Sequence, residues 1–214
     1  MKENFEILAL QLAECGREFY RRGWVLGTSG NFSALASSEP FRLCITASGN
    51  DKGALPAADT HFLEIDETAR ALRGGGKPSA ETALHLAIYK LKPAARAILH
   101  THSVWGTILS DVFFEQRAIK IENYEMLKGL AGVATHEHTE LLPIIENSQN
   151  YLELSATLEQ TLLAHKAAHG VYLRRHGLYT WGENVAEAKR HVEIFEFLFE
   201  VVGRRLQINI EGAL

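Results

Sequence analysis

The sequence predicts a layered α/β domain rather than an all-helical one, and three observations support this. Apolar residues recur at spacings of three and four at both ends of the chain, which is the period of an amphipathic helix. Between these ends lie short β-prone runs separated by Gly, Ser, Thr and Asn, as is typical of strands and turns. The connections are long enough to hold further helices, which would flank the strands. The 214 residues are expected to form one domain, 1–214.

The first half of the chain is expected to contain two helices with three strands between them. The opening helix ends near Gly23 and has an apolar stripe made of Phe5, Leu8, Leu12, Cys15 and Phe19. Three β-prone runs are expected to be strands, namely 24–35, 41–53 and 61–66. A helix of about four turns is expected within 73–93, with Pro78 near its first turn and Pro93 at its end.

The second half is expected to continue the alternation. Residues 95–103 predict a strand, 155–170 a helix and 170–182 another strand. A terminal helix follows, because Asn184 and Glu187 occupy the positions of a capping box. Its apolar stripe consists of Val185, Ala188, Val192, Phe195, Phe199 and Val202.

Composition and charge favour a small-molecule partner. The formal net charge is -4, and no block of five like charges occurs, so nothing indicates binding to nucleic acid or to an anionic membrane. No apolar segment approaches the ~18 residues of a membrane span. Acidic residues interrupt the first segment, unlike a signal peptide, and the only cysteines are Cys15 and Cys44. We therefore expect a cytoplasmic protein without disulfides.

The segment "AILHTHSVWG" (97–106) contains a candidate metal clamp. Side chains at positions i and i+2 of a strand share a face, so His100 and His102 can reach one ion. Catalytic zinc has three protein ligands and an open position, so a third ligand is needed. By local context the best third ligand is His176, at the end of a predicted strand and before a glycine. The pair alone does not separate a metal site from two unrelated histidines.

Two other histidine pairs compete with this one. His136 and His138 repeat the spacing in "THEHTE", but no apolar run precedes them, so an exposed loop is expected there. His165 and His169 are four residues apart at the end of a predicted helix, where histidines also suit the helix dipole. We expect neither pair to be the metal site.

Three small polar segments are candidates for a phosphate site. They are "GTSGN" (27–31), "TASGNDKG" (46–53) and "KPSAE" (77–81). Such loops present backbone N–H groups and hydroxyls without bulky side chains, and a serine at a helix start adds the positive end of the helix dipole. Each could be an ordinary turn, but three of them beside a metal motif favour phosphate binding.

Two glutamates are candidates for acid–base chemistry. Glu81 falls in the first turn of its predicted helix, where an acid can simply complement the dipole. Glu125 lies in "NYEMLKGL", close enough to Lys128 to form an ordinary surface ion pair. Composition does not choose between these roles.

Taken together, the motifs "GTSGNFS", "ITASG", "KPSAE", "LHTHS" and "RRHGL" resemble the class II aldolase/adducin family, in that family's order and over nearly the whole chain. The segments "NYEMLKGL", "PIIENSQN" and "RRHGLYTWGENVAEAK" look most like its branch of dehydratases that act on a methylthio ketose phosphate in methionine salvage.

This resemblance implies a three-layer α/β/α domain with a central, mostly antiparallel sheet, assembled as a homotetramer with active sites near subunit boundaries. It also implies one zinc ion per subunit, held by His100, His102 and His176. The residues that match the family's phosphate-binding region are Thr28, Asn31, Ser48, Gly49 and Ser79. Lys52 is added from its charge and location alone.

The acid–base role differs between branches of the family. In the aldolases the glutamate of the "PSxE" motif has this role, which corresponds here to Glu81. In the dehydratases the role looks to belong to the glutamate of "EMLKG", here Glu125. We rank Glu125 first and expect Glu81 to be a supporting, metal-adjacent residue.

The resemblance thus implies a zinc-dependent hydro-lyase whose partner is a small ketose phosphate. One alternative is a zinc-dependent sugar-phosphate aldolase or pentulose-phosphate 4-epimerase of the same family. Another is a metal-free interaction module like the adducin head domain. A cupin oxygenase with a His-x-His motif fits less well, because several amphipathic helices do not suit a small β-barrel.

Overall fold

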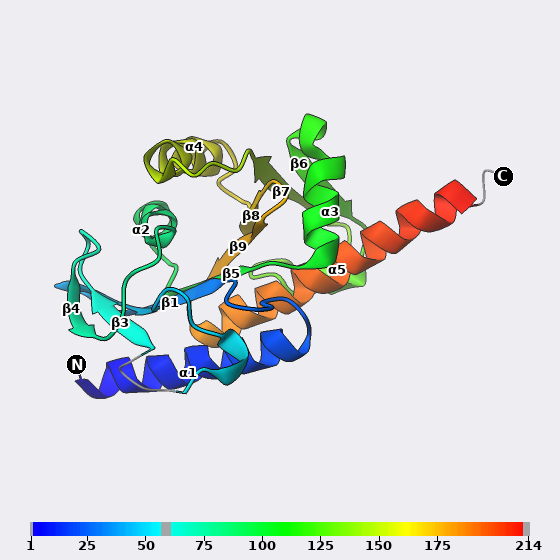
Figure 1. Ribbon diagram of the computed structural model, residues 1–214. Coiled ribbons are helices and arrows are strands. Elements are labelled where there is room, and N and C mark those ends of the chain that lie inside the picture. Colours follow the sequence, from blue (N-terminus) through cyan, green and yellow to red (C-terminus); the bar gives the residue numbers. More distant parts are fainter. Residues whose placement is uncertain (1, 57–60, 212–214) are drawn as a thin grey trace.

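The computed structural model describes residues 2–56 and 61–211, and within them one mixed sheet is flanked by helices (Figure 1). The described strands are β1 (Asn31–Ser38), β2 (Phe41–Thr46), β3 (Phe62–Ile65), β4 (Ala71–Gly74), β5 (Ala97–Thr101), β6 (Ala118–Glu122), β7 (Thr139–Ile145), β8 (Gly170–Leu173) and β9 (Gly177–Gly182). The described helices are α1 (Lys2–Arg21), α2 (Thr82–Leu91), α3 (Val104–Val112), α4 (Tyr151–Ala164) and α5 (Val185–Glu211), with short 3-10 helices η1 (Lys52–Ala54), η2 (Phe114–Gln116) and η3 (Glu125–Gly129).

The sheet has the strand order β4-β3-β2-β1-β5-β9-β8-β7-β6. Every described pair of neighbours is antiparallel except β7 and β8. The expected mostly antiparallel sheet is therefore confirmed. β5 lies at its centre between β1 and β9, so its ends are surrounded by the ends of other strands.

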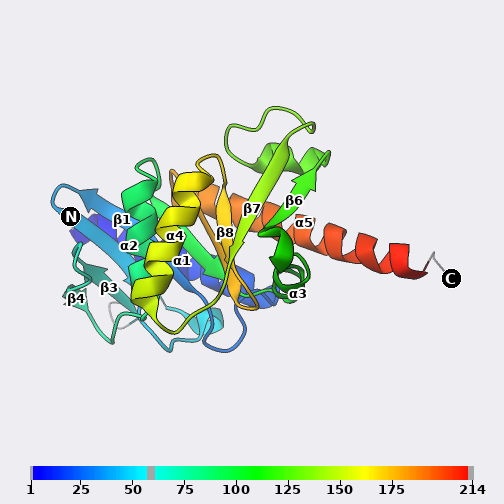
Figure 2. The same ribbon diagram turned by 90° about the horizontal axis from the view of Figure 1, so that it is seen from above.

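Helices cover both faces of this sheet, as the three-layer prediction requires. α2 and α4 pack on one face, while α1 and α5 pack on the other (Figures 1 and 2). Successive side chains of β5 point to opposite faces of the sheet. Ile98 therefore packs with α2 and α4, whereas Leu99 packs with α1 and α5. A third apolar cluster joins α3, the middle of α5, β6 and β7.

The capping prediction for α5 is confirmed. The amide of Glu187 donates to Oδ1 of Asn184 at 2.9 Å, and the amide of Glu183 donates to the Glu187 carboxylate at 2.8 Å. These two contacts satisfy backbone donors that a helix start leaves unpaired. The long α5 therefore begins at a position set by local sequence.

Several element boundaries were predicted wrongly. The run 170–182 is a hairpin of β8 and β9 rather than one strand, because Arg175 adopts a φ of 54 and turns the chain. α4 ends at Ala164, so His169 precedes β8 and does not lie in a last helical turn. Pro78 lies outside α2, since a turn at Ser79 separates it from the helix start.

The segment between Ser103 and Pro143 was not resolved into elements by sequence pattern. It contains α3, η2, β6, η3 and the first part of β7. The short strand β4 was also missed. Among the helices of the described ranges, none has the length and apolar character needed to cross a lipid bilayer.

Candidate metal centre and phosphate cavity

The end of β5 places the first two histidines. His100 shares the face of Ile98, toward α2 and α4, and its side chain is buried. His102 follows the strand, and its backbone N–H donates to the carbonyl of Trp24 at 2.7 Å. The two Nε2 atoms are 2.8 Å apart. The predicted pair thus consists of His100 in β5 and His102, the first residue after this strand.

The turn between β8 and β9 brings His176 to the same place. β9 pairs with β5 through Leu178 and Thr101, so the residues just before β9 meet the end of β5. Gly177 permits this approach, because a Cβ there would lie 2.6 Å from His100 Cε1 and 2.9 Å from His102 Cδ2. The ligand atoms of the three histidines lie within 4.8 Å of one another.

Hydrogen bonds from behind the rings determine which nitrogen faces the centre. The Nδ1 hydrogen of His100 donates to the carbonyl of Leu178 at 2.9 Å, and that of His176 donates to Oδ1 of Asn147 at 3.2 Å. Each Nε2 is then left with a free lone pair, the arrangement that metal-binding imidazoles show. Tyr179 stacks on His100, with ring centroids 3.9 Å apart, and fixes its plane.

Electrostatics also favour neutral imidazoles, which are the metal-binding form. Burial lowers the pKa of His102 to about 4 and lowers the pKa of His100 well below its usual value. With His176 beside them, these two imidazoles complete a group of three histidine nitrogens, which is the donor set of a catalytic zinc site. The residues present therefore fit a divalent ion such as zinc.

Glu81 lies directly beside the three histidines. One carboxylate oxygen is 3.1 Å from His176 Nε2, the other is 3.7 Å from His100 Nε2, and Asn31 donates to it. Burial alone would raise the pKa of this carboxyl, but His100, His176 and Asn31 lower it far below its usual range. Glu81 is thus a fixed anion beside the three histidines; its role next to a metal stays a prediction.

The predicted phosphate residues line one small cavity beside this centre. Its volume is about 110 Å³, and His102 and Glu81 form part of its wall. All six predicted residues line it, namely Thr28, Asn31, Ser48, Gly49, Lys52 and Ser79. Three loops that are distant in sequence therefore meet where an anion would lie within reach of a bound metal.

Lys52 supplies the positive charge of this cavity. It is 1% exposed, and its ammonium group donates to the carbonyls of Asn50 at 2.7 Å and Thr28 at 3.1 Å. Burial lowers its pKa to about 8, although Asp51 and Glu81 act in the opposite direction. A bound phosphate would place negative charge beside the ammonium group and so favour its charged form, which burial disfavours.

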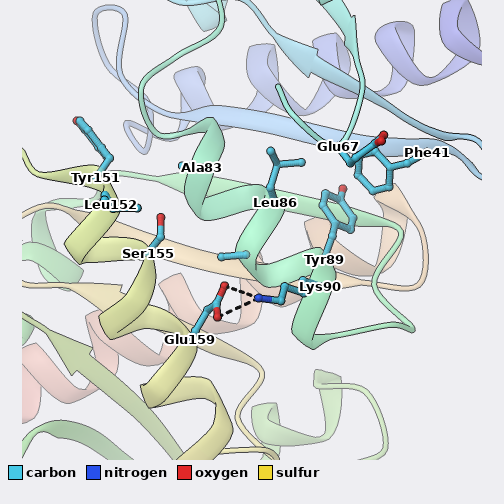
Figure 3. Close-up of a pocket in the computed structure, with 11 residues that line it drawn as sticks. Phe41, Glu67, Ala83, Leu86, Tyr89, Lys90, Tyr151, Leu152, Ser155 and Glu159 are labelled. Carbon is cyan, nitrogen blue, oxygen red and sulfur yellow. Dashed lines mark hydrogen bonds and ion pairs between the residues drawn. The ribbon is translucent and has the colours of Figure 1, made fainter. Parts of the chain in front are cut away.

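A larger groove of about 660 Å³ lies between α2 and α4 (Figure 3). Its wall is mostly apolar, and Lys90 pairs with Glu159 at its edge at 3.2 Å. None of the predicted metal or phosphate residues lines it. The smaller cavity therefore holds the reactive groups.

Glu125 is not brought to this centre by its own chain. Its side chain is 72% exposed, and its contacts in the described part of the chain are to Lys128 and His136. Glu125 lies in the segment before β7, whereas Asn147 follows the end of β7, and seven strand residues span roughly 20 Å. The two predicted acid–base candidates thus occupy opposite ends of the sheet.

The exposed loop expected around His136 and His138 is present, since residues 135–138 form no strand and the two side chains are 56% and 29% exposed, whereas Glu140 is 1% exposed within β7. The helix-end context expected for His169 was wrong. His169 contacts Glu140 rather than capping a helix.

The residues that sequence reasoning missed at the main centre are Asn147 and Tyr179. Asn147 had a local signal, since it directly follows the apolar run at 141–145.

Comparison with known proteins gives matches over nearly the whole chain. The profile of the Class II Aldolase and Adducin N-terminal domain matches residues 10–202. A protein of Methylococcus capsulatus named methylthioribulose-1-phosphate dehydratase is 44% identical over 201 residues, covering 94% of this chain and 95% of that protein. A protein of the same name from Pseudomonas aeruginosa is 43% identical over 200 residues, covering 94% and 95%.

Solved structures support the same fold. An L-fuculose 1-phosphate aldolase superimposes with a TM-score of 0.76 at 21% identity, covering 94% of this chain and 87% of that one. YgbL from Escherichia coli, described as a putative aldolase/epimerase/decarboxylase, gives a TM-score of 0.75 at 24% identity and covers 92% and 89%. At these identities the likeness concerns the fold alone.

Proposed function

Because the chain belongs to the class II aldolase and adducin family, we propose that it is a zinc-dependent methylthioribulose-1-phosphate dehydratase of methionine salvage. The observation that carries this proposal is the cavity in which His102, one of three clustered histidines, lies beside a buried lysine and three polar loops. The similarity to named dehydratases over 94% of the chain supports the choice of substrate.

The proposed reaction removes water from 5-methylthioribulose 1-phosphate. The proton at C3 is acidified by the neighbouring C2 ketone, and its removal leaves charge that spreads onto the C2 oxygen. Loss of the C4 hydroxyl as water then gives the enol of 5-methylthio-2,3-diketopentyl 1-phosphate. The chain must therefore hold the phosphate, stabilise charge at C2 and move one proton.

The residues divide these tasks. Lys52 and the loop hydroxyls would bind the phosphate and thereby fix the distance of C2 from the histidines. His100, His102 and His176 would hold one zinc ion, which when bound supplies Lewis acidity at the substrate carbonyl. Glu81, ionised beside the histidines, would balance the positive charge of a bound ion.

Glu125 is our proposed acid–base residue, acting in the site of a neighbouring subunit. An exposed carboxylate roughly 20 Å along β7 from its own metal centre cannot reach substrate there without a large rearrangement. The predicted homotetramer, with active sites near subunit boundaries, removes this difficulty. Lys128 lowers the pKa of Glu125 by hydrogen bonding, so the carboxylate is ionised and able to accept a proton at neutral pH. A cytoplasmic location remains a prediction.

A direct assay tests the proposed reaction. Zinc-loaded protein should consume methylthioribulose 1-phosphate and release water, and His100→Ala or His102→Ala should lose both zinc and turnover. Glu125→Gln should keep zinc and lose dehydration. Full turnover by metal-stripped protein would reject the proposed zinc dependence, whereas an active Glu125→Gln enzyme would move the acid–base role to Glu81.

A second candidate function is a sugar-phosphate aldolase or 4-epimerase. It is supported by the position of Glu81 beside the histidines, because the resemblance assigns the acid–base role of the aldolases to this glutamate. Incubation with fuculose 1-phosphate separates the two, because only one substrate should be consumed efficiently. A metal-free interaction module would bind no zinc stoichiometrically and would turn over neither compound.

A further inference from the structure

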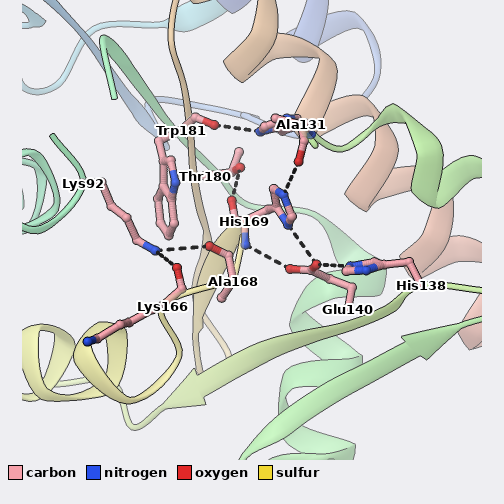
Figure 4. Close-up of polar contacts among 10 residues, drawn as sticks. Lys92, Ala131, His138, Glu140, Lys166, Ala168, His169, Thr180 and Trp181 are labelled. Atoms are coloured by element: carbon pink, nitrogen blue, oxygen red, sulfur yellow. Dashed lines mark hydrogen bonds and ion pairs between the residues drawn. The ribbon is translucent and has the colours of Figure 1, made fainter. Parts of the chain in front are cut away.

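A second group of potential metal ligands lies at the opposite end of β7 from the main centre. It comprises His138, just before β7, Glu140 within β7, and His169, just before β8 (Figure 4). One ligand atom from each lies within 4.8 Å of the others. None of these residues contributes to the cavity that holds the proposed reaction.

The carboxylate is held so that one oxygen faces both imidazoles. Oε1 of Glu140 accepts the backbone N–H of His169 at 2.9 Å. Oε2 is 2.8 Å from Nδ1 of His169 and 3.0 Å from Nε2 of His138. Bonds of about 2.0 to 2.2 Å to one ion, at angles between 90° and tetrahedral, would separate ligand atoms by about 2.8 to 3.6 Å. Both distances fall in this interval.

The surroundings of His169 also resemble those of a metal ligand. Its Nε2 hydrogen donates to the carbonyl of Ala131 at 2.8 Å, which leaves Nδ1 as the nitrogen that can bind an ion. Glu140 is 1% exposed, whereas the His138 side chain is 29% exposed and gives access from solvent. Two imidazoles and one carboxylate are a common donor set for zinc and other divalent transition metals.

We propose that His138, Glu140 and His169 bind a second divalent transition metal ion, with zinc as the probe. The ion would join the segment before β7 to β7 and to the start of β8. Through the His169–Ala131 contact it would also secure the residues that follow η3. The site itself does not depend on the proposed function. Its effect on catalysis does, because η3 carries Glu125.

The competing occupant of this position is a proton. A doubly protonated His169 could donate to both Glu140 and Ala131 and give the same contacts without a metal. Burial acts to lower the pKa of His169, but Glu140 outweighs it and raises that pKa. Lys92, His138 and His191 are the other charged or titratable groups around the pair. The experiment must therefore distinguish a metal ion from a proton.

Zinc stoichiometry after equilibrium dialysis at limiting free zinc provides the first test. Wild-type protein should hold two ions per chain, while His100→Ala and His138→Ala should hold one each and the double variant none. Glu140→Gln gives an independent removal of the second ion if it folds. His136→Ala, a matched control from the same segment with 56% side-chain exposure, should retain both ions.

Cobalt substitution in the His100→Ala background then isolates the second site. A visible cobalt absorption band should appear in His100→Ala and disappear in His100→Ala/His138→Ala. Thermal unfolding of the His100→Ala protein should shift upward on adding zinc, and this shift should be lost with His138→Ala. One ion per wild-type chain, or a second ion that survives His138→Ala, would overturn the proposal. The proposal would also be overturned if NMR showed both ring N–H protons of His169 and their signals did not change on adding zinc.

Discussion

His176 donates its Nδ1 hydrogen to Oδ1 of Asn147 at 3.2 Å, which aims Nε2 of the same ring at His100 and His102. Two separate chain segments, the end of β7 and the β8–β9 turn, therefore determine one ligand orientation. Such supporting hydrogen bonds set the tautomer and basicity of a metal-binding imidazole.

Replacing Asn147 should weaken metal binding without removing a ligand. Asn147→Leu should lower zinc affinity by about 10- to 100-fold, because His176 loses the acceptor that fixes its ring. Asn147→Asp should restore most of the affinity, since a carboxylate accepts the same hydrogen bond. Competition with a chromophoric chelator measures the change. The exposed neighbour Glu146→Gln serves as the control, and equal zinc affinity in Asn147→Leu would show that the contact has no supporting role.

Lys52 should make substrate binding sensitive to alkaline pH. Its pKa is lowered to about 8, so its positive charge is lost as the pH rises through about 8, and KM for the phosphate substrate should increase there. Between about pH 8 and 10.5 the Lys52 amine is protonated in the unfolded chain but not in the folded one. The free energy of unfolding should therefore rise with pH over this interval.

A pH series of KM and kcat measures the effect of Lys52. Lys52→Gln should raise KM and remove its increase above pH 8. Lys77→Gln, at an exposed lysine that does not line the cavity, should leave the profile unchanged. If KM of the Lys52→Gln enzyme still increased above pH 8 as in the wild type, another group would be responsible for that increase.

Mixing two inactive variants tests whether Glu125 serves a neighbouring subunit. Hybrid assemblies of His100→Ala and Glu125→Gln chains should recover about a quarter of wild-type activity, because random pairing places an intact centre beside an intact glutamate in one of four cases. Co-expression with two affinity tags isolates the hybrids, and each variant alone is the control. Hybrids as inactive as their parents would contradict an action across the interface.

The buried hydrogen-bond chain behind Glu81 should contribute to stability. Asn31 links Glu81 to His85, whose Nδ1 accepts from Ser33 at 2.8 Å, and Ser33 contacts the Tyr89 hydroxyl at 3.1 Å. His85→Leu leaves buried polar groups unpaired, so the free energy of unfolding should fall by about 1 to 3 kcal/mol.

Urea unfolding measures the loss caused by His85→Leu. Tyr89→Phe removes only the last hydroxyl of the chain, so its effect should be smaller, about 0.5 to 1.5 kcal/mol. If His85→Leu were as stable as the wild-type protein, the polar chain would have no net stabilising role.

The sequence by itself determined the features that depend on local periodicity. The stripe of α1, the capping of α5 by Asn184 and the shared face of Ile98 and His100 all follow from spacing. The motifs also contained every residue that lines the small cavity beside the histidines. Periodicity did less well between Ser103 and Pro143, where the strands are short and β7 is buried.

The sequence named His100, His102 and His176 as one ligand set, but only the tertiary structure showed how they are assembled and that, among the ten histidines, His138 and His169 also lie close together. His100 and His176 are distant in sequence and meet because β9 pairs with β5, and Asn147 joins them because β7 runs parallel to β8. The same strand direction carries Glu125 to the far end of the sheet and places His138, Glu140 and His169 around one point. Strand order and direction arise from long-range pairing, which local spacing does not encode.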